Sequence, residues 1–210
     1  HPVAHSFPTR RSSDLALARM DYFVSALKGK GIYIKLSPNF GPKLWPDDVD
    51  RVPYAGELGS GKVIDPRNGT VFVSRELQDL QIEQLIKMLE HTNPHTGLTY
   101  AADPVVAVVE LLNEESVLFG GAQKAMQRSP TLRRRMGSRF YEWVKRKYGT
   151  KEKLLDAWGE EAWNSFEYEK LTGESWEEGY VIPAGCHPWY MDPAQLEGSQ
   201  AFRKRRILDA

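Results

Sequence analysis

The sequence predicts an α/β protein built on a parallel sheet. Helix-like and strand-like segments alternate along the chain, and the order strand, loop, helix, strand is typical of such sheets. The run 105–112 is apolar at every position except Glu110, as in parallel strands that helices cover on both faces. With 210 residues, 41% of them hydrophobic, the chain is long enough to bury a sizeable core.

The first predicted elements are a helix followed by a strand. Apolar residues recur at helical spacing, and Gly29 and Gly31 end this pattern before the β-rich run 32–36. The apolar positions of the helix are Leu17, Met20, Phe23, Val24 and Leu27. Residues 37–74 are dense in proline and glycine, and we expect a long irregular loop of the kind that is often functional.

A second helix begins after Ser74, a suitable N-cap, and the turn residues 91–97 end it. Its predicted apolar face contains Leu77, Leu80, Ile82, Leu85, Ile86 and Leu89. The apolar run 105–112 is the second strand. Further helices are expected over 132–148 and 151–158, before a stretch rich in Trp, Gly and Glu at 160–198.

Both ends of the chain suggest a piece of a longer protein. Residues 5–15 resemble the translation of a common sequencing adapter, so we exclude residues 1–15 from the fold. Residues 200–210 are predicted to be the first turns of a helix that has no C-terminal cap. We therefore expect one truncated domain, residues 16–210.

Composition excludes several classes of protein. The 28 basic and 28 acidic residues give a net charge of zero, so no overall field attracts nucleic acid. The basic runs 133–135 and 203–206 fall on predicted helices and are expected to be solvated. No apolar run approaches the roughly 18 residues of a membrane span. The single Cys186 excludes a disulfide scaffold and a multi-cysteine zinc site.

The predicted chemistry lies at the carboxyl end of the second strand, where active sites of parallel α/β proteins collect. Asn113 and Glu114 follow that strand. A carboxyl group at the mouth of an apolar strand is partly desolvated, which raises its pKa and suits general-acid catalysis. The alternative is that the pair only starts a loop or caps a helix. Glu110 is not expected to serve as a second catalytic carboxylate beside Glu114, because the two side chains would lie on the same strand face at different depths.

The stretch 98–116, which includes Glu-Leu-Leu-Asn-Glu at 110–114, resembles the fourth strand of clan A glycoside hydrolases, particularly the cellulase-like group near glycoside hydrolase family 5. Residues 22–36 are similar to the second helix and third strand of those enzymes. The resemblance covers roughly residues 16–159. It implies a fragment of a (β/α)8 TIM barrel, from about the second helix to the region after the fourth strand, with long loop insertions.

The resemblance also implies an activity, the retaining hydrolysis of glycosidic bonds in oligo- or polysaccharides. Glu114 matches the general acid/base, and Asn113 matches the residue that binds the hydroxyl next to the anomeric carbon. Retention needs a second carboxylate about 5 to 5.5 Å away as nucleophile. In the family this residue ends the seventh strand, beyond the part that the resemblance covers. No metal or organic cofactor is implied, and the fragment alone is expected to be inactive.

Two further residues are candidates for substrate binding. Asn39 stands where relatives often carry a histidine, and its amide still suits a sugar hydroxyl. Trp45 lies in the loop after the first strand of this chain and is a candidate aromatic platform for a sugar ring, or else packs that loop. Two other functions stay open: a non-catalytic carbohydrate-binding protein on the same barrel, and an unrelated small α/β domain. The resemblance favours an exported protein and leaves the oligomeric state open.

Overall fold

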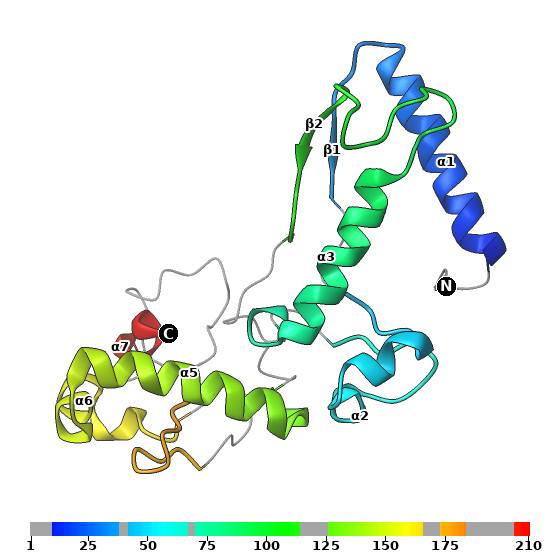
Figure 1. Ribbon diagram of the computed structural model, residues 1–210. Helices are drawn as coiled ribbons and strands as arrows, with labels where there is room; N and C mark the ends of the chain where they lie inside the picture. Colours follow the sequence, from blue (N-terminus) through cyan, green and yellow to red (C-terminus); the bar gives the residue numbers. More distant parts are fainter. Residues whose placement is uncertain (1–9, 38–41, 67–69, 114–125, 166–172, 184–203) are drawn as a thin grey trace.

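The computed structural model describes residues 10–37, 42–66, 70–113, 126–165, 173–183 and 204–210. Helix α1 (Arg10–Lys28), strands β1 (Ile34–Leu36) and β2 (Val106–Val109), and the end of helix α3 (Arg75–Glu90) form one end of the molecule. Helices α2 (Ala55–Leu58), α5 (Pro130–Tyr148), α6 (Lys151–Trp158) and α7 (Lys204–Asp209) lie toward the other end (Figure 1). Helix α3 extends from the sheet toward α2.

The two described strands pair in parallel, as the sequence predicts. Ile34 is opposite Val106 and Leu36 is opposite Val109, with an irregularity between Ile34 and Lys35. The backbone N–H of Glu110 extends the ladder by donating to the carbonyl of Leu36 at 2.8 Å. Both strands are shorter than predicted, and β2 ends at Val109 rather than at residue 112. The expectation that Glu110 lies within the strand is therefore wrong.

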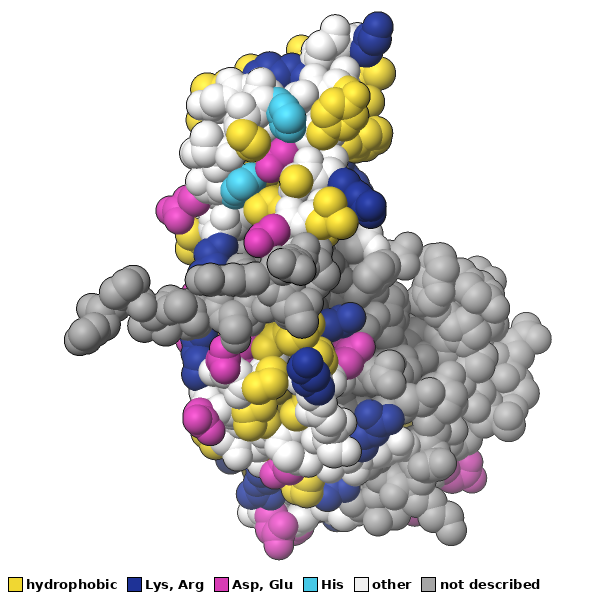
Figure 2. Space-filling model, turned by 90° about the vertical axis from the view of Figure 1, so that its right-hand side faces the viewer, with side chains coloured by type: hydrophobic (Ala, Val, Ile, Leu, Met, Phe, Trp, Pro, Cys, Tyr) yellow, Lys and Arg dark blue, Asp and Glu magenta, His cyan; other side chains and the backbone are white. Residues whose placement is uncertain are grey.

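In the described part of the chain, the sheet packs against a small hydrophobic core on one of its faces. Buried residues from α1, β1 and the segment before β2 meet there: Val24, Leu36, Tyr100 and Val105. The prediction that helices cover both faces of the second strand is wrong for the described residues, because Val108 is 52% exposed. Helix α1 also turns a predicted core residue outward, since Phe23 is 61% exposed. Hydrophobic side chains are accordingly visible on this end of the molecule (Figure 2).

The predicted loop 37–74 contains short helices in its described parts: the 3-10 helices η1 (Pro46–Arg51) and η2 (Thr70–Phe72), and α2. An antiparallel bridge between Leu44 and Ile64 closes the segment. Leu44, Leu58 and Ile64 belong to the largest core cluster, together with residues of α3 and α5. The expectation of an irregular loop is therefore wrong for much of this region, because its apolar residues fold against the two long helices.

Helix α3 begins as predicted, since the Ser74 hydroxyl accepts a hydrogen bond from the N–H of Leu77. Leu77 and Leu80 are buried in the core. Ile82 and Ile86, which the periodicity places on the same apolar face, are 47% and 45% exposed. Only part of the predicted helix face is therefore covered in the described structure.

The predicted helices over 132–148 and 151–158 are confirmed as α5 and α6, capped by Ser129 and Thr150. A separate core joins them to the segment around residue 181. The helix predicted near the C-terminal residue is present as α7. One expectation about this helix is wrong: the basic run 203–206 is not simply solvated, because Arg206 is completely buried.

Among the residues that the structure describes, no helix combines the length and the apolar character needed to cross a membrane.

Candidate functional site

The four predicted site residues differ in what the structure says of them. Glu114 and Asn39 lie outside the described residues. Asn113 is partly buried, and it is the last described residue before the gap at 114–125. Trp45 is partly buried at the start of η1, where its backbone N–H donates to the carboxylate of Asp48 at 3.1 Å. The structure therefore shows the surroundings of Asn113 and Trp45, and the roles of all four residues stay predictions.

Glu110 is the centre of a polar cluster at the carboxyl ends of the two strands. Its carboxylate accepts hydrogen bonds from the Lys35 ammonium at 3.1 Å and from the Ser37 hydroxyl. Lys35 belongs to β1 and Ser37 directly follows it, whereas Glu110 directly follows β2. The side chain of Glu110 therefore links the ends of both strands.

Asn113 completes this cluster. With its amide nitrogen turned toward Glu110, Asn113 donates to both carboxylate oxygens at 3.2 Å. This orientation pairs a donor with an acceptor-only group, whereas the opposite one would place two acceptors together. The segment just before Asn113 is also fixed, because the Gln81 side chain of α3 donates to the carbonyl of Leu111 at 2.9 Å.

The charge state of Glu110 follows from these donors. The hydrogen bond from Ser37, then that from Lys35, lowers the pKa of the Glu110 carboxyl below its ordinary value. Glu110 is therefore ionised at neutral pH and serves as an acceptor. A carboxyl group with this pKa does not suit general-acid catalysis, which needs a raised pKa.

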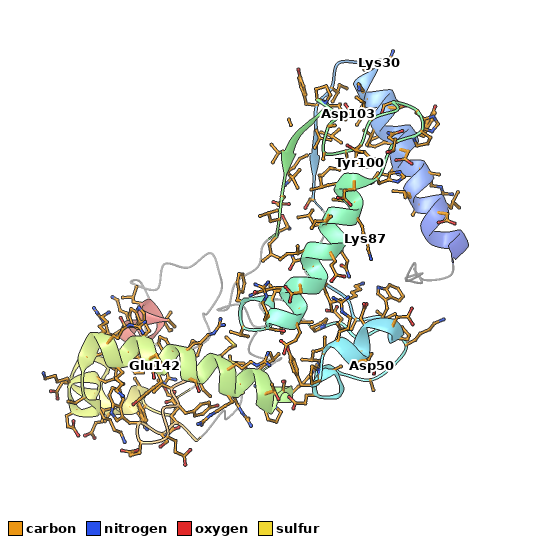
Figure 3. All side chains as sticks on the ribbon, in the orientation of Figure 1. Lys30, Asp50, Lys87, Tyr100, Asp103 and Glu142 are labelled. Carbon is orange, nitrogen blue, oxygen red and sulfur yellow. The ribbon has the colours of Figure 1, made fainter. Side chains whose placement is uncertain are left out.

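A second polar cluster lies at the amino ends of the strands. The buried Asp21 of α1 accepts a hydrogen bond from the Tyr100 hydroxyl at 2.7 Å, and the His91 Nε2 atom lies 2.9 and 3.0 Å from its two oxygens. Burial, and then the contact with Asp21, raises the pKa of Tyr100. Lys28 pairs with Asp103 at 2.9 Å nearby, and Figure 3 shows Tyr100 and Asp103 beside the sheet and α1. These bonds tie α1 to the segment before β2.

His91 and His95 have a spacing that would suit a metal ion only on a continuous helix, and α3 ends at Glu90. His91 is instead paired with Asp21, and His95 packs edge-on against Tyr22 with ring centroids 5.9 Å apart. Across the described residues, no group of three or more His, Cys, Asp or Glu side chains is arranged to hold a metal ion.

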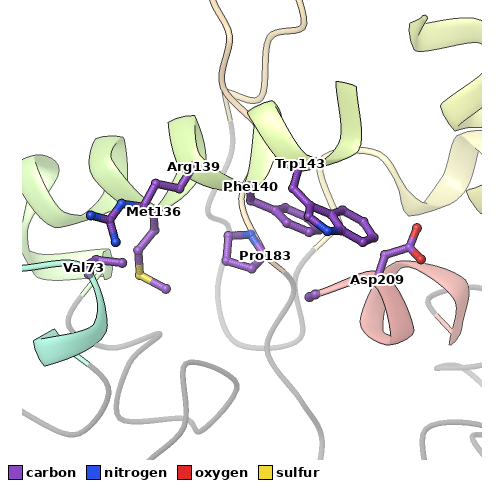
Figure 4. Close-up of a pocket in the computed structure, with 8 residues that line it drawn as sticks. Val73, Met136, Arg139, Phe140, Trp143, Pro183 and Asp209 are labelled. Carbon is purple, nitrogen blue, oxygen red and sulfur yellow. The ribbon is translucent and has the colours of Figure 1, made fainter. Parts of the chain in front are cut away.

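A shallow pocket of about 270 Å³ lies on α5, away from the strand ends. Its walls are mainly apolar, with Phe140 and Trp143 stacked at 6.0 Å, and Arg139 and Asp209 line it as well (Figure 4). Asp209 already accepts hydrogen bonds from Lys147 and Trp158. Neither Asn113 nor Trp45, the two predicted site residues that the structure describes, lines this pocket.

The residues that sequence reasoning missed are Lys35, Ser37 and Glu110. A signal was present, since the carboxyl ends of parallel strands lie at one edge of a sheet, and all three residues are close to such an end. The pairing of β1 with β2 and the early end of β2 then bring them together.

The chain was compared with protein-family models, with curated proteins and with solved structures, and none of the three comparisons found a match. The resemblance to clan A glycoside hydrolases therefore stays a prediction from residues 16–159.

Proposed function

We propose that this chain is part of a retaining glycoside hydrolase of clan A that acts on oligo- or polysaccharides. The observation that carries the proposal is the polar cluster of Lys35, Ser37, Glu110 and Asn113 at the carboxyl ends of two parallel strands. Active sites of parallel α/β sheets and barrels form at this end. Glu114, the proposed general acid/base, is the next residue along the chain.

In the proposed reaction, the Glu114 carboxyl gives its proton to the glycosidic oxygen while a second carboxylate attacks the anomeric carbon. The bond to the leaving sugar breaks, and a glycosyl-enzyme forms. Glu114, now a carboxylate, removes a proton from water, which attacks the same carbon and releases the product with retained configuration. Asn113 orients the substrate by a hydrogen bond to a sugar hydroxyl. The second carboxylate is proposed to lie in a later part of the complete protein.

The gene is the first test. Reading its frame beyond codon 210 is expected to reveal further βα units and a glutamate at the end of the seventh strand. A complete barrel without that glutamate would favour the non-catalytic carbohydrate-binding protein instead. A frame that encodes no further βα units would contradict the barrel itself.

Kinetics of the complete protein give the second test. Glu114→Gln is expected to lower kcat/KM for a glycoside with a poor leaving group by roughly 10²–10⁴-fold, the usual contribution of general acid–base catalysis. Azide should restore turnover of an activated aryl glycoside by Glu114→Gln, because this anion attacks the glycosyl-enzyme without a general base. Glu115→Gln, the same substitution at the next residue, to which the proposed reaction gives no role, is the matched control and should keep its activity. Equal losses in both variants would contradict the role of Glu114.

A further inference from the structure

Glu110 is the residue at the strand ends that the proposed reaction does not use. It is not a surface carboxylate with one partner, since its side chain is 23% exposed and contacts residues of both strand ends. Its backbone N–H is also fixed, by the hydrogen bond to the carbonyl of Leu36. Glu110 is thus held at both its backbone and its carboxylate.

The partners of Glu110 all donate, and they come from different parts of the chain. Lys35 and Ser37 hold the carboxylate on the side of β1, and Asn113 contacts both of its oxygens. An ionised carboxylate only accepts hydrogen bonds. The amide nitrogen of Asn113 must therefore face Glu110, and the Asn113 carbonyl oxygen and second N–H face elsewhere.

We propose that Glu110 is a positioning residue that fixes the side-chain amide of Asn113 for binding a sugar hydroxyl. This inference rests on the proposed function and assigns a role that the family resemblance does not supply. The Ser37 hydroxyl and the backbone hydrogen bond to Leu36 hold Glu110 in place, so the orientation of Asn113 is set by residues at the end of the neighbouring strand. Glu110 itself touches neither the substrate nor the reacting atoms.

Simple stabilisation by the Lys35–Glu110 ion pair is a weaker explanation of this arrangement. Lys35 is 53% exposed in this pair, and exposed ion pairs contribute little to stability. The ion pair also leaves the contact of Glu110 with Asn113 unexplained. A variant that removes the ion pair and keeps Glu110 therefore separates the two explanations.

The test uses the complete protein with two substrates, an aryl glycoside and its 2-deoxy counterpart, which lacks the hydroxyl assigned to Asn113. In Glu110→Gln the new amide can donate toward Asn113, so the orientation of Asn113 is no longer fixed. We expect kcat/KM for the hydroxylated substrate to fall about 5- to 10-fold, the value of roughly one hydrogen bond. The 2-deoxy substrate should change less than about twofold.

The ratio of the two kcat/KM values is the decisive readout, because partial unfolding lowers both values equally. Lys35→Met removes the exposed ion pair but leaves Glu110 held by the Ser37 hydroxyl and by its backbone hydrogen bond to Leu36. It is therefore the matched control and should leave the ratio unchanged. In the double variant Glu110→Gln/Asn113→Ala, the ratio should equal that of Asn113→Ala alone. If Glu110→Gln does not fold, the ratio is measured in Glu110→Asp instead, since this variant withdraws the carboxylate from Asn113 by one methylene group.

Two failures can be told apart. Hydrolysis of both substrates by the wild-type protein, with the same ratio in Glu110→Gln and in the wild type, would overturn the positioning role and leave the proposed function intact. A complete wild-type protein that hydrolyses neither substrate would overturn the proposed function and, with it, this inference.

Discussion

The buried ion pair between Arg206 and Glu174 allows a prediction about what holds α7 in place. Both side chains are inaccessible to solvent. The Arg206 guanidinium donates to the two carboxylate oxygens at 2.5 and 3.0 Å, and to the carbonyls of Ala162 and Ile182 at 2.5 and 2.7 Å. The perturbation is Arg206→Met, which keeps the length of the apolar stem and removes all four hydrogen bonds.

The expected cost is large because the partner carboxylate stays buried. Glu174 keeps its hydrogen bonds from the N–H groups of Asn164 and Ile182, at 2.7 and 2.9 Å, which compensate part of the lost interaction. Removing one member of a buried pair typically costs about 3 to 5 kcal/mol. We expect Arg206→Met to lower the free energy of unfolding by this amount, a large part of the ~5–15 kcal/mol of an ordinary domain.

Urea unfolding followed by tryptophan fluorescence suits this measurement, because the Arg206 guanidinium lies 5.0 Å from the ring centroid of Trp158. The matched control is Arg205→Met, the same substitution one position earlier in α7. The Arg205 side chain is 49% exposed, and its partner Asp209 keeps other donors, among them Lys147 and Trp158. The control should therefore shift the urea midpoint very little.

The reasoning would be refuted by equal midpoint shifts in Arg205→Met and Arg206→Met. Equal shifts would mean that the position in α7, and not the burial of the pair, sets the cost. A double variant, Arg206→Met/Glu174→Gln, should recover part of the lost stability, because it leaves no buried charge unpaired.

Three more predictions concern stability. Hydrogen bonds from Arg135 hold the pKa of Glu76 at about 2, below its ordinary 4.5, even though burial opposes the shift. A depressed folded-state pKa stabilises the protein above pH 4.5, and this stability is lost as the pH falls from about 4.5 to about 2. Glu76→Gln should therefore flatten the pH dependence of the free energy of unfolding in that window. The same pH dependence in Glu76→Gln and in the wild type would contradict this prediction. Gly137→Ala should cost about 1–3 kcal/mol in urea unfolding, because the added methyl overlaps the buried ring of Tyr180, whereas Gly56→Ala, with open space around it, should not destabilise. In the isolated 210-residue chain, amide hydrogens of β1 and β2 should exchange faster than those of α5, because the described sheet has two strands and uncovered edges; equal protection by mass spectrometry would refute this.

The sequence predicts the regular elements well where local signals are strong. The periodicity of α5 and α6, and the predicted cap at Ser74 for α3, place these helices within a few residues of their observed bounds. Parallel pairing of the strands also follows from their apolar character and the helix between them. Burial is predicted less well, since Phe23, Ile82 and Val108 have the periodicity of core residues and are exposed. Periodicity defines an apolar face and does not show what covers it.

The candidate site likewise has features that the sequence predicts and features that only the tertiary structure shows. Sequence alone determined that Asn113 and Glu114 follow an apolar strand, because composition and order along the chain carry that information. Only the tertiary structure decided that Glu110 joins Lys35, Ser37 and Asn113, since this depends on the register of β1 against β2 and on where β2 ends. The buried pairing of Arg206 with Glu174 likewise joins residues 32 positions apart. Local sequence sets the conformation of a segment, whereas contacts between distant segments arise only when the chain packs.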